Sequence, residues 1–269
     1  MVEQAKKTIF VEKLDSLNDL EIIVADKKYE VPGELRAYRD EIGRLNDLKD
    51  GWYNGSVAIV DGDVQNPLNV FPGGFYDFTA TKLDAVPAEL LPDQYPVDTT
   101  IEQLFKQWEV DNDERGRYLG IAYLLSTKGG NELSLVQRAK GMAIAADCIS
   151  SPGSTPNPPF NEKGFDFKTY LQTPIGKEMN EEYKMKSDEF EIGDIYLFDD
   201  KTQSPFLAIE ARTPLSTGDL AKRIYGDEGA IKEHPALISF PTNAIDTVIE
   251  RFEVFPPVAY LMNVYNQNR

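Results

Sequence analysis

The chain has 269 residues, of which 41% are hydrophobic and 11% aromatic, as is ordinary for a folded globular protein. Its formal net charge of −17 disfavours nonspecific binding to nucleic acid and to anionic membranes, so we expect neither as a partner. No run of about 18 apolar residues occurs, and no apolar signal core lies near the start, so neither a membrane span nor a leader is predicted. The lone Cys148 cannot form an internal disulfide, which favours a reducing cytoplasm, and the apolar run before it predicts a buried thiol.

The first part of the chain is rich in predicted β-structure. Apolar residues three or four apart predict one helix over 35–48, and a threonine cap predicts another over 100–105. Asp61-Gly62 between two β-branched runs is a strong hairpin signal. The polar run at 111–114 is the expected domain junction, which makes 1–114 a β-rich domain. Runs of β-branched and aromatic residues predict its strands at 8–11, 21–24, 56–60, 68–71 and 75–81.

Strands and helices alternate in the second part, 115–269. An apolar run at 119–126, a Gly-Gly turn and a second run at 133–137 predict a hairpin. A helix that carries an acidic run is expected to begin at Thr173-Pro174, with Thr173 as its cap and Pro174 in its first turn. Further strands are expected at 195–198 and 207–211, and further helices at 219–225, 248–255 and 258–264.

The acidic run reads KEMNEEYKM and spans Lys177–Met185. It places Glu178, Glu181 and Glu182 within an arc of roughly 100° on a helix. Three carboxylates on one face repel each other unless water or a divalent cation neutralises them, and Mg²⁺ suits such a site. A solvated acidic face, with Lys177 relieving part of the repulsion, is the alternative interpretation.

The same run resembles the helical half of the Nudix box, whose pattern is G-x5-E-x7-R-E-U-x-E-E-x-G-U, with U a bulky apolar residue. Lys177 stands at the Arg position, and Glu178, Met179, Glu181 and Glu182 match theirs. Three flanking segments resemble the strand before the box, the loop that enters it and a later strand of the same family; they lie at 133–138, 151–154 and 206–216. The resemblance covers about 115–260.

This resemblance implies a mixed α/β domain, with a Nudix-like mixed sheet sandwiched by helices at 115–269 after the β-rich domain. It implies a hydrolase for a nucleoside diphosphate derivative or a similar pyrophosphate, a small phosphorylated molecule. Mg²⁺ or Mn²⁺ would be held by Glu178, Glu181 and Glu182. The catalytic carboxylates would be Glu182, Glu228 and Glu233, and the substrate contacts would come from Arg138, Gly153, Lys177 and Arg212. The β-rich domain would add substrate contacts or a homodimer surface.

Several positions depart from the family pattern. The isolated Glu of the pattern falls at Thr169, the first Gly falls at Lys163, and the Gly that ends the helix is replaced by Lys184. These departures favour an alternative in which the chain is a non-catalytic Nudix-like binding or regulatory protein. One histidine, His234, cannot form a multi-histidine zinc site, and a structural or exposed role is expected for it.

Overall fold

The computed structural model describes residues 8–46, 54–60, 64–82, 103, 106, 116–137, 139, 148–151, 153–154, 157–200, 204–228, 231 and 235–268. The hairpin turn at Asp61-Gly62, the expected junction at 111–114 and most of the expected helix at 100–105 lie outside these residues. Within them, no helix is both long enough and apolar enough to cross a membrane.

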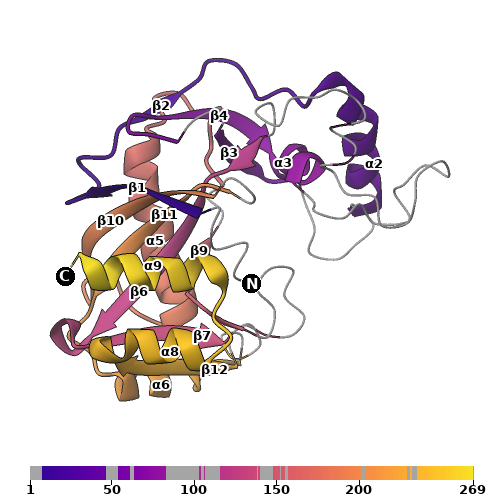
Figure 1. Ribbon diagram of the computed structural model, residues 1–269. Helices are drawn as coiled ribbons and strands as arrows, with labels where there is room; N and C mark the ends of the chain where they lie inside the picture. The colour runs from indigo at the N-terminus through magenta and orange to yellow at the C-terminus, as the bar shows by residue number, and fades with distance from the viewer. Residues whose placement is uncertain are drawn as a thin grey trace.

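A mixed sheet forms the larger part of the molecule (Figure 1). The central pair, β11 and β6, is parallel, and the pairs outside it are antiparallel. Two short strands extend the sheet, β8 beside β7 and β9 beside β6. The expected mixed α/β class is therefore confirmed. In spatial order the main strands are β1 (Thr8–Leu14), β10 (Glu191–Asp200), β11 (Phe206–Arg212), β6 (Gly120–Thr127), β7 (Glu132–Gln137) and β12 (Ala236–Pro241), with β8 at Ile149–Ser150 and β9 at Gly153–Ser154.

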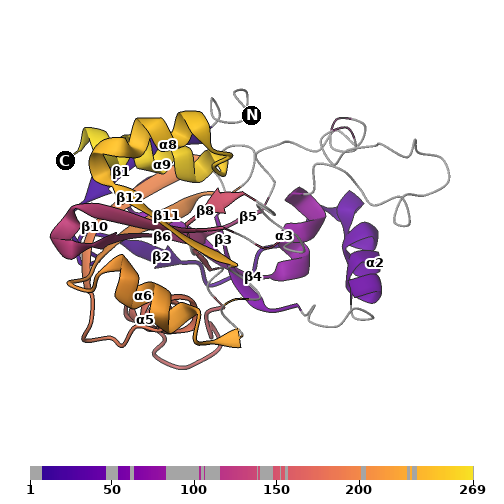
Figure 2. The ribbon, with the colours of Figure 1, turned by 90° about the horizontal axis from the view of Figure 1, so that it is seen from below.

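Helices cover both faces of this sheet, as Figure 2 shows. One face packs against α5 (Phe167–Tyr183) and α6 (Thr217–Ile224), and the other against α8 (Ile245–Arg251) and α9 (Pro256–Gln267). Strand β11 serves both cores because side chains alternate along a strand. Its Leu207 and Ile209 join the α5 side, whereas Phe206 and Ala208 join the α9 side.

The smaller sheet has the order β2, β4, β3, β5, and two helices lie beside it (Figure 1). The expected pairing of 56–60 with the run after Asp61-Gly62 is confirmed, since β3 and β4 are antiparallel neighbours. Their bounds are β2 (Ile22–Val24), β3 (Ser56–Val60), β4 (Leu68–Gly74), β5 (Arg117–Tyr118), α2 (Arg36–Asn46) and α3 (Phe75–Lys82).

Helix α3 corrects the strand expected at 75–81. The Asp77 carboxylate accepts a hydrogen bond of 2.7 Å from the Gly74 N–H, which satisfies a backbone donor just before the helix. Asn54 accepts another, of 2.9 Å, from the Tyr76 N–H. The aromatic residues that suggested a strand pack from the helix instead, and the Phe78 ring meets Tyr118 edge-on at 4.3 Å.

The position expected for the domain boundary does not separate the two sheets. Strand β1 precedes it and joins the larger sheet, whereas β5 follows it and joins the smaller one. Leu20 and Val60 share one core with Phe167. A buried ion pair between Arg117 of β5 and Asp199 of β10 also links the sheets. Independent folding of 1–114 and 115–269 remains a prediction.

Candidate functional site

The acidic helix α5 begins before Thr173-Pro174, which lies inside it rather than at its start. Asp166 is the N-cap, and its carboxylate accepts a hydrogen bond of 2.8 Å from the Thr169 N–H. Hydrogen bonds from Thr169 lower the pKa of Asp166. The helix starts here because an aspartate cap stands directly before Phe167, the first residue of the apolar stripe.

A stripe of residues about four apart fixes how α5 lies on the sheet. Its members are buried and belong to one core, and they are Phe167, Leu171, Ile175, Met179 and Tyr183. The Tyr183 hydroxyl also donates to the Ser134 carbonyl of β7, at 3.1 Å. Burial, and next the charge of Glu182, raise the pKa of Tyr183 well above its ordinary value, so the phenol stays protonated and remains a donor. Met179 and Tyr183 therefore act as packing residues of the core.

The candidate metal ligands on α5 that the structure describes differ in exposure. Glu182 lies beside the apolar stripe and is only 5% exposed. Glu181 is exposed, and its carboxylate lies 3.6 Å from the Lys177 ammonium. Glu178 is helical, one turn before Glu182, and its side chain lies outside what the structure describes. Among the side chains that are described, no three His, Cys, Asp or Glu residues gather to hold a metal.

The helix ends in a sharp reversal at Lys184, which adopts the left-handed conformation with φ 55° and ψ 36°. The Lys184 N–H donates to the Asn180 carbonyl at 3.0 Å, and the Met185 N–H donates to the Met179 carbonyl at 3.1 Å. The bond from Lys184 to Asn180 is that of the αL motif, a helix end that normally has glycine at the left-handed position. Met185 then enters the core, fully buried.

Helix α6 contacts this reversal through Arg223. The guanidinium donates to both carboxylate oxygens of Glu189, at 2.6 and 2.8 Å, and to the Lys184 carbonyl at 3.2 Å. Hydrogen bonds from Arg223, and then from the Lys186 N–H, lower the pKa of Glu189 to about 2. The sequence interpretation missed both residues because their side chains meet 34 positions apart.

Arg212 lies on the other face of the sheet from α5. It forms a two-bond ion pair with Glu210, at 2.9 and 2.7 Å, and Glu210 also accepts from the Tyr265 hydroxyl of α9 at 3.4 Å. Glu210 is 3% exposed, so this arginine neutralises a buried carboxylate. Gly193 leaves room for the pair, since a Cβ there would lie 3.1 Å from a Glu210 oxygen.

The remaining residues singled out in the sequence lie partly within and partly outside the described residues. Gly153 is in β9, which lies against α5. Glu228 is exposed, four residues after α6 ends. Arg138, Glu233 and His234 are outside the described residues. Cys148 is buried, as expected.

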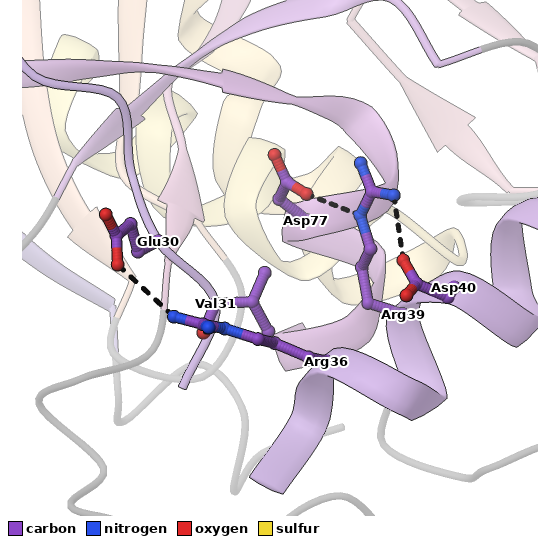
Figure 3. A pocket seen from close by; sticks show the side chains of 6 residues that line it. All are labelled: Glu30, Val31, Arg36, Arg39, Asp40 and Asp77. Carbon is purple, nitrogen blue, oxygen red and sulfur yellow. Dashed lines mark hydrogen bonds and ion pairs between the residues drawn. The ribbon is translucent and has the colours of Figure 1, made fainter. Parts of the chain in front are cut away.

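A separate hollow of about 400 Å³ lies beside the smaller sheet (Figure 3). Arg39 donates to Asp77 at 2.7 Å and to Asp40 at 3.1 Å, and Arg36 lies 3.3 Å from Glu30. The hydrogen bond that Arg39 donates to Asp77 is the main cause that raises the pKa of Arg39. Three carboxylates therefore face two guanidinium groups, and the lining offers a phosphate no excess of positive charge.

No protein-family model matches the sequence, and no curated protein matches it. Among solved structures, the chain is similar to the MutT protein from Methanosarcina mazei Go1, with 16% identity, 56% of this chain and 92% of that chain covered, and a TM-score of 0.37. It is also similar to a NUDIX-family hydrolase from Clostridium perfringens, with 10% identity, coverage of 56% and 97%, and a TM-score of 0.37.

A third similar structure is the NUDIX domain of Shewanella oneidensis NrtR, recorded with ADP ribose, at 10% identity, coverage of 56% and 86%, and a TM-score of 0.34. NrtR is also recorded with a 27mer DNA, at 11% identity, coverage of 54% and 58%, and a TM-score of 0.32; for the present chain, the absence of a nucleic acid partner stays a prediction. These likenesses concern only the path of the backbone, and the proposed function rests on the residues of the present protein.

Proposed function

We propose that this protein is a Nudix-type, metal-dependent hydrolase that cleaves a nucleoside diphosphate derivative or a similar pyrophosphate. The observation that carries the proposal is the structure of the Lys177–Met185 run. Met179 and Met185 stand where the Nudix pattern has bulky apolar residues, and both are fully buried. Lys184 stands where the pattern has its final Gly, and its backbone is left-handed, the conformation for which glycine is used.

The donor chemistry of α5 suits a hard divalent cation. Carboxylate oxygens are preferred ligands of Mg²⁺, and Mn²⁺ takes the same donors. Glu178 and Glu182 are one helical turn apart on the same side of α5 and would hold the ion. Glu181 lies further round toward solvent and would join them on release from Lys177. When bound, the ion would neutralise phosphate charge and lower the pKa of a water molecule.

Residues around α5 would then bind and orient the diphosphate. Gly153 belongs to the strand beside the helix and has no side chain to prevent the close approach of a phosphate. Lys177 is exposed on the outer side of α5 and could exchange its contact with Glu181 for a phosphate. Glu228, in the segment that follows α6, is a candidate general base. Arg212 is a weaker candidate for substrate binding because Glu210 already occupies two of its donors.

The proposal is tested by a screen of nucleoside diphosphate derivatives, ADP ribose among them, with Mg²⁺ or Mn²⁺ and with release of monophosphate as the readout. The wild-type protein is expected to turn over at least one compound in a metal-dependent way, and Glu182→Gln is expected to abolish it. Glu250→Gln is the matched control, since it makes the same change at an exposed position of α8 on the far face.

Metal binding gives a second readout that does not depend on the choice of substrate. A hundredfold excess of Mn²⁺ over its dissociation constant should stabilise the fold by about 2.7 kcal/mol. The Glu182→Gln protein should lose most of that response and keep its metal-free stability. A wild-type melting curve that ignores both ions at millimolar concentration would refute the metal site.

A second candidate function is non-catalytic binding of a nucleotide derivative. Thr169 stands where the pattern has its isolated Glu, so that carboxylate is absent from the site. The Thr169 N–H donates instead to Asp166, the N-cap of α5. Calorimetry with ADP ribose would distinguish the two functions, since saturable binding without monophosphate release favours the binding protein. A cytoplasmic location and a homodimer remain predictions from the sequence.

A further inference from the structure

The turn that follows the carboxylate helix is closed by a clamp from a neighbouring helix. Arg223 of α6 bonds to two points of this turn, the Lys184 carbonyl and the Glu189 carboxylate. Glu189 in turn accepts from the Lys186 N–H at 2.8 Å, and its own carbonyl accepts from the Thr213 hydroxyl at 2.7 Å. The segment from 184 to 189 is thus held to both α6 and the end of β11.

We propose that Arg223 and Glu189 are positioning residues that set the place of the Glu182 carboxylate, and this rests on the metal site proposed above. Glu182 is two residues before Lys184, in the last turn of α5. Any rotation of that turn moves the carboxylate directly. Lys184 favours such a rotation, because the left-handed conformation is costly for a residue with a Cβ. Unwinding the turn would relieve that cost.

The opposite side of the same turn is fixed by a different contact. Tyr183 is fully buried and donates to the Ser134 carbonyl of β7, so the helix end is attached to the sheet below. Arg223 supplies the attachment from the side, and the Lys184 ammonium adds a contact of 3.2 Å to Asp227, beyond the end of α6. Together these contacts restrict the final turn of α5 to one orientation.

This clamp contributes more to the position of the Glu182 carboxylate than to the stability of the fold. The Arg223 side chain is 33% exposed and that of Glu189 23%, and ion pairs so open to water add little to the stability of a fold. The geometry, in contrast, is specific, because the planar guanidinium meets both carboxylate oxygens in a two-bond fork. Residues that hydrogen-bond directly to metal ligands typically change metal affinity by about 10–100-fold when replaced, and for Arg223, which acts through the backbone of the turn, we expect the lower end of that range.

The experiment compares the wild type with Arg223→Gln, Arg223→Lys and Glu189→Gln. Lys222→Gln is the matched control, since it removes a positive charge from the adjacent, largely exposed position of α6. Mn²⁺ dissociation constants would be measured by calorimetry, and hydrogen exchange of the amides at 183–189 would be followed in metal-free protein.

Arg223→Gln is expected to weaken Mn²⁺ binding by about tenfold or more and to speed exchange at Lys184 and Met185. Its melting temperature should fall by no more than about 4 °C. Arg223→Lys should show an intermediate loss, since it keeps the charge and loses the fork, and it serves as the test if the Gln variant does not fold. Because the pKa of Glu189 is about 2, the affinity ratio of wild type to variant should stay constant from about pH 5 to about pH 8.

Two outcomes would overturn the inference, and they differ from failure of the proposed function. Wild-type affinity for Mn²⁺ in a folded Arg223→Gln protein would show that the clamp does not position Glu182. Equal losses in Arg223→Gln and Lys222→Gln would assign the effect to net charge alone. If the wild type itself binds no Mn²⁺, the metal site and this inference fall together, whereas the exchange data would still report whether the clamp holds the turn.

Discussion

The left-handed residue at the end of α5 provides a quantitative test of the helix-end geometry. Replacing Lys184 by Gly and, separately, by Ala removes the contact with Asp227 in both variants, so that loss cancels when the two are compared. The remaining difference is the backbone preference at φ 55°. The assay is urea or thermal unfolding of the metal-free proteins, with the difference in unfolding free energy as the result.

The magnitude follows from two opposing costs. A residue with a Cβ pays roughly 1–2 kcal/mol in the left-handed region, and glycine does not. Glycine loses about 0.4–1 kcal/mol more backbone entropy on folding than alanine. The Gly variant should therefore be about 1 kcal/mol more stable than the Ala variant, or about 2–4 °C higher in melting temperature.

Lys177 gives the matched control, because it is exposed in the interior of the same helix. There the order should reverse, and Ala should be more stable than Gly by about 1 kcal/mol. The same order at both positions, with Ala ahead at Lys184, would show that residue 184 is not left-handed. The register of the Nudix-like run would then lose its main support.

Three further changes test the surrounding framework. Asp166→Ala removes the N-cap of α5 and should cost about 1 kcal/mol at neutral pH. Because hydrogen bonds from Thr169 lower the pKa of Asp166, this difference in stability should fade as the pH drops through the acid range. Unfolding free energies measured against pH would show it. Arg117→Met removes the guanidinium that pairs with the buried Asp199 and should cost about 3–5 kcal/mol in urea unfolding, and a second change of Asp199 to Leu should recover much of it. Met179→Ala opens a cavity under α5 and should cost about 2–5 kcal/mol, a loss that a substitution at an exposed residue would not produce.

Local patterns were sufficient where one side of an element packs on the core. The β6–β7 hairpin, the β3–β4 pair and helix α2 follow from apolar spacing and turn residues that lie close together in the sequence. The acidic run was readable as a helix, and Met179 packs in the core, but its spacing did not indicate that Glu182 is buried while Glu181 is exposed.

Contacts between distant residues decided the rest, because spacing along the chain carries no information about partners that folding brings together. At helix α3, which replaced an expected strand, the Tyr76 N–H donates to the side chain of Asn54, 22 residues earlier. Arg212 pairs with Glu210, its neighbour on the same side of β11, and only the tertiary structure shows that this side faces Tyr265 of α9 and lies away from α5. Likewise, nothing in the acidic run indicates that its last turn is held by Arg223, since α6 comes to lie beside α5 only when both helices pack on the same face of the sheet.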